Sequence, residues 1–222
     1  MKAADLKLLL VDAIRMLAHA GIVDHSGHGS ARRDASTFYV NSAASARGAL
    51  TIDDIVTVDL DGALVEGRAR PPLEFHIHSE IYRARPDVNA VMHTHPQWST
   101  FLTMVGAPYR PVYAQGTLLG EIPLVDSPMS VNTRAMGERV AATLGAGTAV
   151  LLKSHGAVIV APDVVECFAL AAYLEENAYR QYMAMQIGKP YVFSDEEQRV
   201  FRERLRTPAL LKKTWDHYRS KL

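Results

Sequence analysis

Residues 85–95 read RPDVNAVMHTH, and the fold is best read outward from this stretch. Asn89 to Met92 are predicted to form a buried strand that runs into His93, Thr94 and His95. Side chains two positions apart on a strand point to the same side of the sheet. We therefore expect His93 and His95 to face one cation at the end of this strand.

A third imidazole occurs in Lys153-Ser154-His155-Gly156, a predicted junction between a strand and a turn. Gly156 lets the backbone turn tightly, so the ring of His155 can project into a cleft. Three histidines leave open positions on zinc, manganese or a similar ion, which is the pattern of a catalytic site. From the residues alone, the alternative that these are surface or hydrogen-bonded structural histidines stays open.

The rest of the chain alternates between predicted strands and predicted helices. Strands are expected within 26–32 and at 38–40, 55–60, 63–65, 89–92, 149–152 and 156–160. Helices are expected at 5–20, 73–84, 97–104, 131–144, from 162 onward and at 209–220, with 106–126 irregular. Many connections are short, which favours a mainly antiparallel sheet covered by helices.

Composition restricts the function classes. The chain has 222 residues, 48% of them hydrophobic, and its 24 basic and 24 acidic side chains cancel. This length favours one domain over residues 1–222, with a C-terminal helical tail at about 194–222. The balanced charge lacks the electrostatic footprint of a nucleic-acid-binding protein, so no nucleic-acid partner is expected.

The sequence shows no pattern typical of a targeting signal or a membrane span. No apolar run approaches the roughly 20 residues of a membrane-spanning helix. Asp5 and Asp12 interrupt the only apolar stretch near the N-terminus, unlike a signal peptide. The one cysteine, Cys167, excludes an internal disulfide and a cysteine-cluster zinc site, and it fits a reducing compartment. We expect a cytoplasmic protein with no membrane partner.

Glu74 follows two prolines near the start of a predicted helix. A carboxylate beside a cation can take up and return a proton, so Glu74 is a candidate general acid and base. The alternative is an acidic residue that only stabilises a helix N-terminus. His78 and Tyr82 lie one and two turns further and share a face with Glu74, whereas His76 faces elsewhere. We expect His78 to support the site rather than to bind the ion.

Taken together, the motifs resemble those of the class II aldolase/adducin family. The matching pieces lie in one order along the chain, from the first helix to about Tyr179. They are SGHGSAR at 26–32, EFHIH at 74–78 with Ile81-Tyr82, RPDVNAVMHTH at 85–95, and Ser154-His155-Gly156 followed by a long helix.

The resemblance implies a fold, a metal site and an assembly. The fold would be a three-layer α/β/α sandwich around a central, mainly antiparallel sheet. His93, His95 and His155 would bind a divalent metal ion, zinc or manganese first and cobalt or iron as alternatives, with Glu74 as the acid/base. Tyr113 would donate a proton from a neighbouring subunit, or else be a half-buried loop tyrosine. Family enzymes are often homotetramers with sites between subunits.

The sequence departs from the sugar-phosphate aldolases of this family where those enzymes hold phosphate. Their asparagine is replaced by His28, their Thr-Gly loop by the segment 41–47, and their paired serines by Pro72-Leu73. Proline has no N–H and leucine has no hydroxyl, so a phosphate would lose donors that it needs. We therefore expect a substrate other than a phosphosugar.

We expect His28, Ser30 and Arg47 to bind the substrate, with His28 and Arg47 meeting a carboxylate or phenolic oxygen. Arginine suits bidentate carboxylate binding, although Arg47 could equally be a solvated loop residue. The Gly-His-x-Ser motif resembles a decarboxylase branch of the family.

We therefore expect a metal-dependent carbon–carbon lyase. The favoured reaction is decarboxylation of a hydroxy-aromatic carboxylate or carboxylated ring-cleavage product through a metal-stabilised enolate, as in aromatic catabolism. The first alternative is an aldolase or epimerase acting on a non-phosphorylated sugar or hydroxy acid. The second is a non-enzymatic, adducin-like scaffold.

Overall fold

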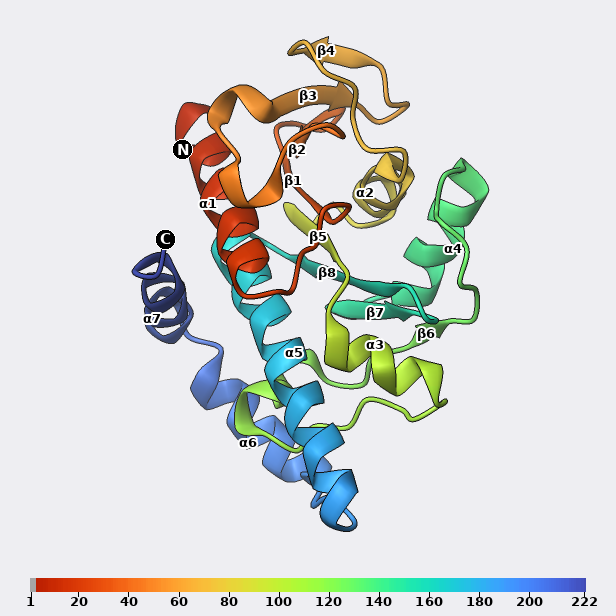
Figure 1. The fold of residues 1–222 in the computed structure, drawn as a ribbon, viewed down its shortest axis with the longest axis vertical. Coiled ribbons are helices and arrows are strands. Elements are labelled where there is room, and N and C mark those ends of the chain that lie inside the picture. The colour runs from red at the N-terminus through yellow and green to blue at the C-terminus, as the bar shows by residue number, and fades with distance from the viewer. Residues whose placement is uncertain (1–2) are drawn as a thin grey trace.

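A sheet of eight strands forms the middle layer of the protein in the computed structural model, which describes residues 3–222 (Figure 1). The strand order is β4-β3-β2-β1-β5-β8-β7-β6. All neighbours are antiparallel except β6 and β7, which are parallel. The strands are β1 (His28–Arg32), β2 (Thr37–Asn41), β3 (Ile55–Asp59), β4 (Leu64–Glu66), β5 (Ala90–Thr94), β6 (Leu124–Val125), β7 (Ala149–Leu152) and β8 (Gly156–Ala161).

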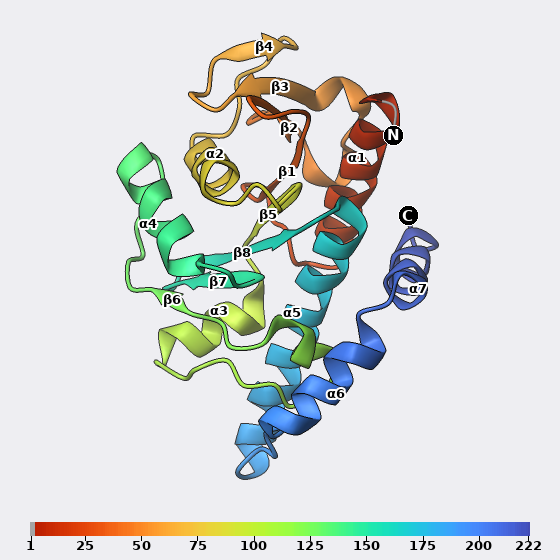
Figure 2. The ribbon, with the colours of Figure 1, turned by 180° about the vertical axis from the view of Figure 1, so that it is seen from behind.

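Helices cover both faces of this sheet, so the predicted three-layer α/β/α sandwich is confirmed (Figures 1 and 2). Helices α2 and α4 lie on one face, and α1, α3 and α5 lie on the other. The helices are α1 (Ala3–His19), α2 (Phe75–Ala84), α3 (Gln97–Met104), α4 (Arg134–Leu144), α5 (Val164–Ile187), α6 (Asp195–Leu205) and α7 (Pro208–Arg219), with short 3-10 turns η1 (Arg47–Ala49), η2 (Ile52–Asp54) and η3 (Ala114–Leu119).

The central strands bury side chains on both faces. On β5, Val91 packs into the core beneath α2 and α4, whereas Met92 packs into the core beneath α1 and α5. On β8, Val158 and Ile159 divide in the same way. Adjacent strand residues point to opposite faces, so a strand buried on both faces reads as a continuous apolar run. This is why the sequence predicted these strands as short apolar runs.

Strand β5 lies between β1 and β8, and this places the predicted site residues together. His28 on β1 pairs with His93 on β5, and His93 in turn pairs with Val158 on β8. Directly opposed residues on neighbouring strands share a face of the sheet. A Cβ atom at Gly156 would overlap the carbonyl oxygen of Thr94, so glycine there allows β8 to start close against the end of β5.

The segment 106–126 departs from expectation. It was predicted to be irregular, but it contains η3 and the two-residue strand β6, which pairs with β7. Two residues are too few to show an alternating pattern, so no sequence signal could reveal this strand.

The C-terminal tail folds as two helices on the α5 side of the sheet. Ser194 and Glu197 form a capping box at the start of α6. On α7, Trp215 is 4% exposed, and its ring lies 5.4 Å from that of Phe168 on α5. The tail thus packs on α5, while a single domain over residues 1–222 stays a prediction.

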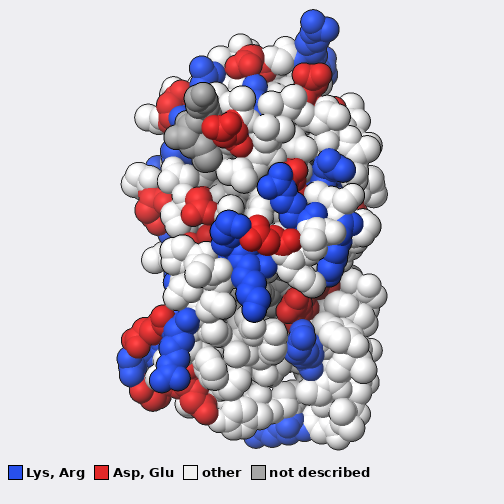
Figure 3. Space-filling model, turned by 90° about the vertical axis from the view of Figure 1, so that its left-hand side faces the viewer, with Lys and Arg blue, Asp and Glu red and all other residues white. Residues whose placement is uncertain are grey.

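The surface shows no concentration of one charge on the face drawn in Figure 3, where basic and acidic side chains alternate. Among residues 3–222, no helix is both long enough and apolar enough to span a bilayer.

Candidate metal centre and active site

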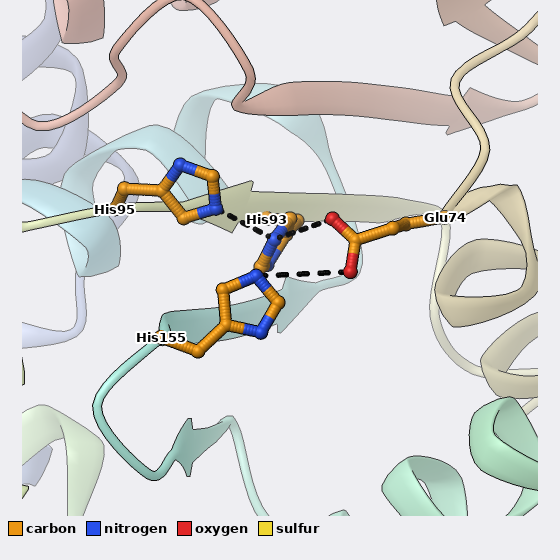
Figure 4. A group of neighbouring side chains, drawn as sticks. All are labelled: Glu74, His93, His95 and His155. Carbon is orange, nitrogen blue, oxygen red and sulfur yellow. Dashed lines mark hydrogen bonds and ion pairs between the residues drawn. The ribbon is translucent and has the colours of Figure 1, made fainter. Parts of the chain in front are cut away.

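Four side chains converge at the end of strand β5 (Figure 4). Glu74, His93, His95 and His155 each direct one ligand atom inward, and these atoms all lie within 4.8 Å of one another. The Nε2 atoms of His93 and His95 are 3.0 Å apart. The carboxylate of Glu74 lies 3.4 Å from Nε2 of His93 and 3.7 Å from Nε2 of His155. The structure thus brings together the three histidines and the glutamate singled out in the sequence.

Neighbouring acceptors fix the orientation of two of these rings. His93 donates from Nδ1 to the carbonyl oxygen of Ala157 at 3.1 Å, and His95 donates from Nδ1 to Oδ1 of Asp24 at 2.8 Å. A neutral imidazole that donates from Nδ1 carries a lone pair on Nε2, which is the arrangement found in metal-binding histidines. If both rings direct Nε2 lone pairs inward, a cation bound between these two atoms, which lie 3.0 Å apart, stabilises the arrangement. The donor set therefore fits a divalent cation.

The charge states of the cluster favour the same ion. Burial lowers the pKa values of His95 and His155, so both rings are neutral at physiological pH. Burial opposes ionisation of Glu74, but its contact with His93 and a hydrogen bond from the backbone N–H of Val131 hold its pKa well below the usual range. One carboxylate and neutral imidazoles are the protonation states that a metal ion requires.

Glu74 precedes the first residue of α2 and is 9% exposed. Val131 donates its N–H to Oε1 at 2.7 Å, while Oε2 faces His93. The carboxylate is therefore anchored through one oxygen and directed toward the histidines through the other. Glu74 lies at the start of a helix, as the sequence predicts. Its contacts with Val131 and His93 show that it also belongs to the cluster.

A cleft of about 340 Å³ opens beside Glu74. Its wall contains five residues at the positions where the sequence departs from the sugar-phosphate aldolases: His28, Ala43, Arg47, Pro72 and Leu73. The remaining lining residues are His25, Ser26, Glu74 and Ser130.

Arg47 is held by backbone carbonyl groups. Its Nε donates to Gly27 at 2.7 Å, and its Nη1 donates to the carbonyl oxygens of Ser42, Ala43 and Ser45. The side chain is 5% exposed, so the alternative that it is a solvated loop residue is wrong. Arg47 lines the cleft while its Nε and Nη1 atoms are engaged by backbone carbonyl groups.

Ser30 and His28 lie on β1 and belong to a buried polar chain. Nδ1 of His28 is 2.7 Å from Nε2 of His78, Nδ1 of His78 is 2.6 Å from Oγ of Ser30, and that oxygen is 2.7 Å from the Tyr82 hydroxyl. Ser30 is fully buried, so it reaches the cleft only through His78 and His28. Burial lowers the pKa of His28 well below its ordinary value and that of His78 to about 3, so both rings are neutral.

Tyr113 lies apart from this site. Its ring packs under the guanidinium of Arg180 at 4.0 Å, and it lines a separate pocket with Tyr173 and Tyr218. Within one chain Tyr113 therefore does not join the cluster, and its role from a neighbouring subunit stays a prediction.

Sequence reasoning missed Asp24. The residue precedes β1 and binds the backbone N–H groups of Ser26 and Gly27 as well as His95. An aspartate two residues before a Ser-Gly pair predicts a local turn, but nothing in the sequence predicts its contact with a histidine 71 positions away.

Comparisons with known proteins identify the family of this chain. The model of the class II aldolase and adducin N-terminal domain matches residues 9–182, which include all four cluster residues. The L-fuculose phosphate aldolase of Methanocaldococcus jannaschii is 30% identical over 173 residues, which cover 78% of this chain and 93% of that protein. The 3,4-dihydroxyphthalate decarboxylase of Arthrobacter keyseri is 32% identical over 181 residues, which cover 75% of this chain and 73% of that protein.

Solved structures share the fold. The L-fuculose 1-phosphate aldolase from Glaciozyma antarctica aligns with a TM-score of 0.86 at 24% identity, over 98% of this chain and 88% of that chain.

Proposed function

We propose that this chain, which belongs to the class II aldolase and adducin family, is a divalent-metal-dependent decarboxylase of a hydroxy-aromatic carboxylate or a carboxylated ring-cleavage product. The proposal rests on the convergence of Glu74, His93, His95 and His155 beside a cleft. Three imidazoles and a carboxylate suit zinc, manganese, cobalt or iron, and they leave room for a substrate oxygen.

The walls of the cleft support a substrate without phosphate. Pro72 has no N–H to donate, and neither Leu73 nor Ala43 has a hydroxyl group. Leu73 is 81% exposed at the cleft, where its apolar side chain suits an aromatic ring better than a phosphate. Arg47 and His28 remain as donors for a carboxylate or phenolic oxygen.

Glu74 is the residue that we assign to proton transfer. Because it is ionised, it can first accept a proton from a substrate hydroxyl and then deliver it to the carbon that loses carbon dioxide. The C–C electron pair forms the new C–H bond, and solvent supplies the one proton that the overall reaction consumes. A bound divalent cation supplies Lewis-acid stabilisation of the negative charge that develops on the substrate during bond cleavage.

The cleavage of a non-phosphorylated sugar or hydroxy acid is the second candidate. It is favoured by the 30% identity to an L-fuculose phosphate aldolase, because retro-aldol cleavage needs the same charge stabilisation. A non-enzymatic scaffold is disfavoured, because such a protein has no need to keep a cluster of this geometry.

We further propose that the protein is a cytoplasmic homotetramer with sites between subunits. The location of Tyr113 away from the cluster of its own chain supports a shared site. The single cysteine, Cys167, is fully buried and unpaired, which suits a reducing compartment.

The decisive experiment is a parallel assay of two bond-breaking reactions. The purified protein, loaded with zinc or manganese, is given 3,4-dihydroxyphthalate and L-fuculose 1-phosphate, and carbon dioxide and aldehyde release are both measured. We expect carbon dioxide from the aromatic acid and no cleavage of the phosphosugar. Aldehyde release without carbon dioxide, or full turnover in the presence of a chelator, would reject the proposal.

A further inference from the structure

The buried polar chain of Tyr82, Ser30, His78 and His28 has a direction. Its three contacts, at 2.7, 2.6 and 2.7 Å, each accommodate one hydrogen atom. All four side chains are at most 3% exposed, so water does not supply missing partners. A donor without a protein partner is therefore tolerated only where a nearby anion or a ligand in the cleft can face it.

Each direction leaves one donor without a partner in the chain, and the two directions differ in where that donor lies. If His28 donated to His78 and His78 donated to Ser30, Ser30 would have to donate to Tyr82. The Tyr82 hydroxyl would then have no acceptor, because within residues 3–222 its only hydrogen-bond partner is Ser30. In the opposite direction Tyr82 donates to Ser30, Ser30 to Nδ1 of His78, and Nε2 of His78 to Nδ1 of His28. A neutral His28 then carries its one proton on Nε2.

This Nε2 atom lies at the reactive end of the chain. It is buried without a hydrogen-bond partner, at 4.0 Å from Oε2 of Glu74, and His28 lines the cleft. A proton on Nε2 faces the carboxylate of Glu74 favourably, whereas a lone pair would repel it. Both ends of the chain therefore favour the same tautomer.

We propose that Ser30 and His78, backed by Tyr82, are positioning residues that hold the proton of His28 on Nε2, so that His28 donates a hydrogen bond to an anionic oxygen of the substrate beside Glu74. The proposal rests on the proposed function for the identity of that oxygen, a carboxylate. The tautomer itself is independent of the reaction. A fixed N–H donor selects an oxyanion and rejects a donor group at this position.

The tautomer can be read by nitrogen NMR on zinc-loaded protein that carries ¹⁵N-labelled histidine. The His28 signals are assigned by their absence from the His28→Gln variant. We expect the wild type to show a protonated Nε2 and an unprotonated Nδ1 on His28. A proton on Nδ1 would overturn the inference, whatever reaction the enzyme catalyses.

Three variants separate positioning from packing. Ser30→Ala removes the donor to His78, so both His28 tautomers should be populated. The chemical shifts of the two ring nitrogens of His28 should then approach each other. Tyr82→Phe should keep the proton on Nε2, because Ser30 still donates to His78. Phe38→Leu is the packing control, because Phe38 packs on the rings of His78 and Tyr82 without a hydrogen bond. Unchanged His28 signals in folded Ser30→Ala protein would refute the role of Ser30.

A binding measurement tests the donor role. Salicylate and catechol are matched probes, because only salicylate carries a carboxylate. By calorimetry on the zinc-loaded protein, we expect Ser30→Ala to weaken the binding of salicylate about tenfold and to leave the binding of catechol unchanged. The Phe38→Leu control should bind both probes as the wild type does. An equal loss for both probes would refute the assignment of the carboxylate to His28. Failure of the wild type to bind salicylate would count against the proposed function, while the NMR result would still decide the tautomer.

Discussion

Nδ1 of His95 and Oδ1 of Asp24 are 2.8 Å apart at the edge of the cluster, although 71 positions separate them in the sequence. The same carboxylate oxygen also accepts hydrogen bonds from the N–H groups of Ser26 and Gly27. These contacts lower the pKa of Asp24 against the opposing effect of burial. Asp24 thus ties the ring of His95 to the loop that leads into β1.

We expect Asp24→Asn to weaken divalent metal binding about tenfold, because removing the carboxylate charge makes His95 a poorer ligand. The asparagine oxygen can still accept from Ser26 and Gly27, so the loop should keep its shape. The affinity is measured by competition with a chelator. Asp61→Asn is the control, because Asp61 is exposed and pairs with Arg83. Equal metal affinity in the Asp24 and Asp61 variants would contradict the prediction.

His95→Ala should abolish metal binding and turnover while the fold survives. The side chain of His95 is 16% exposed and lies beyond the end of β5, so its removal leaves the sheet intact. Bound metal is measured by elemental analysis, and folding by circular dichroism. His19→Ala is the matched control, since His19 is exposed at the end of α1 and does not line the cleft. A fully active His95→Ala protein in chelator would eliminate the metal mechanism.

Glu74→Gln should keep the metal and slow the reaction. Glutamine can still accept the N–H of Val131 but cannot carry the transferred proton, so we expect turnover to fall by about 10²–10⁴-fold. Single-turnover kinetics and metal content on the same sample separate the two effects. Normal turnover in this variant would remove Glu74 from the acid/base role.

Stability should fall as the pH falls from about 6.5, because of His78. Burial lowers its pKa to about 3 in the folded protein, whereas an unfolded histidine has a pKa of about 6.5. Between these values the unfolded chain binds a proton that the folded chain excludes. Acid therefore favours unfolding by about 1.4 kcal/mol per pH unit, and this contribution is fully present above pH 6.5.

Urea unfolding between pH 5 and pH 6 checks this linkage. In His78→Gln the free energy of unfolding should depend less steeply on pH, with nearly one proton fewer taken up on unfolding. The variant should also be less stable overall. His25→Gln should retain the wild-type slope. A wild-type slope in His78→Gln would show that another group causes the acid sensitivity.

Tyr113 should act on a neighbouring subunit if the proposed assembly is correct. We expect Tyr113→Phe and His95→Ala proteins to be impaired separately and to regain activity when their subunits are mixed and reassembled. Hybrid oligomers contain some sites with an intact tyrosine from one chain and intact histidines from the other. Lack of recovery despite demonstrated subunit exchange would place the function of Tyr113 elsewhere.

The sequence alone determined the elements and the central set of site residues. The predicted helices and strands lie close to those observed, because periodicity and glycine or proline signals are local properties of the chain. His93 and His95 could be assigned to one site because two positions on one strand share a side, and both do contribute to the cluster. His155 and Glu74 were candidates from their local sequence context, and the family resemblance assigned both of them to the same site.

Only the tertiary structure decided how distant residues meet. The register that pairs His28 with His93, and the packing of α2 behind β1, create the chain that continues through His78. The anchoring of Arg47, the contact of Asp24 with His95 and the separation of Tyr113 from its own cluster also depend on the path of the whole chain. Such contacts join segments tens of residues apart, and hydrophobic periodicity specifies which face a residue takes but not which partner it meets there.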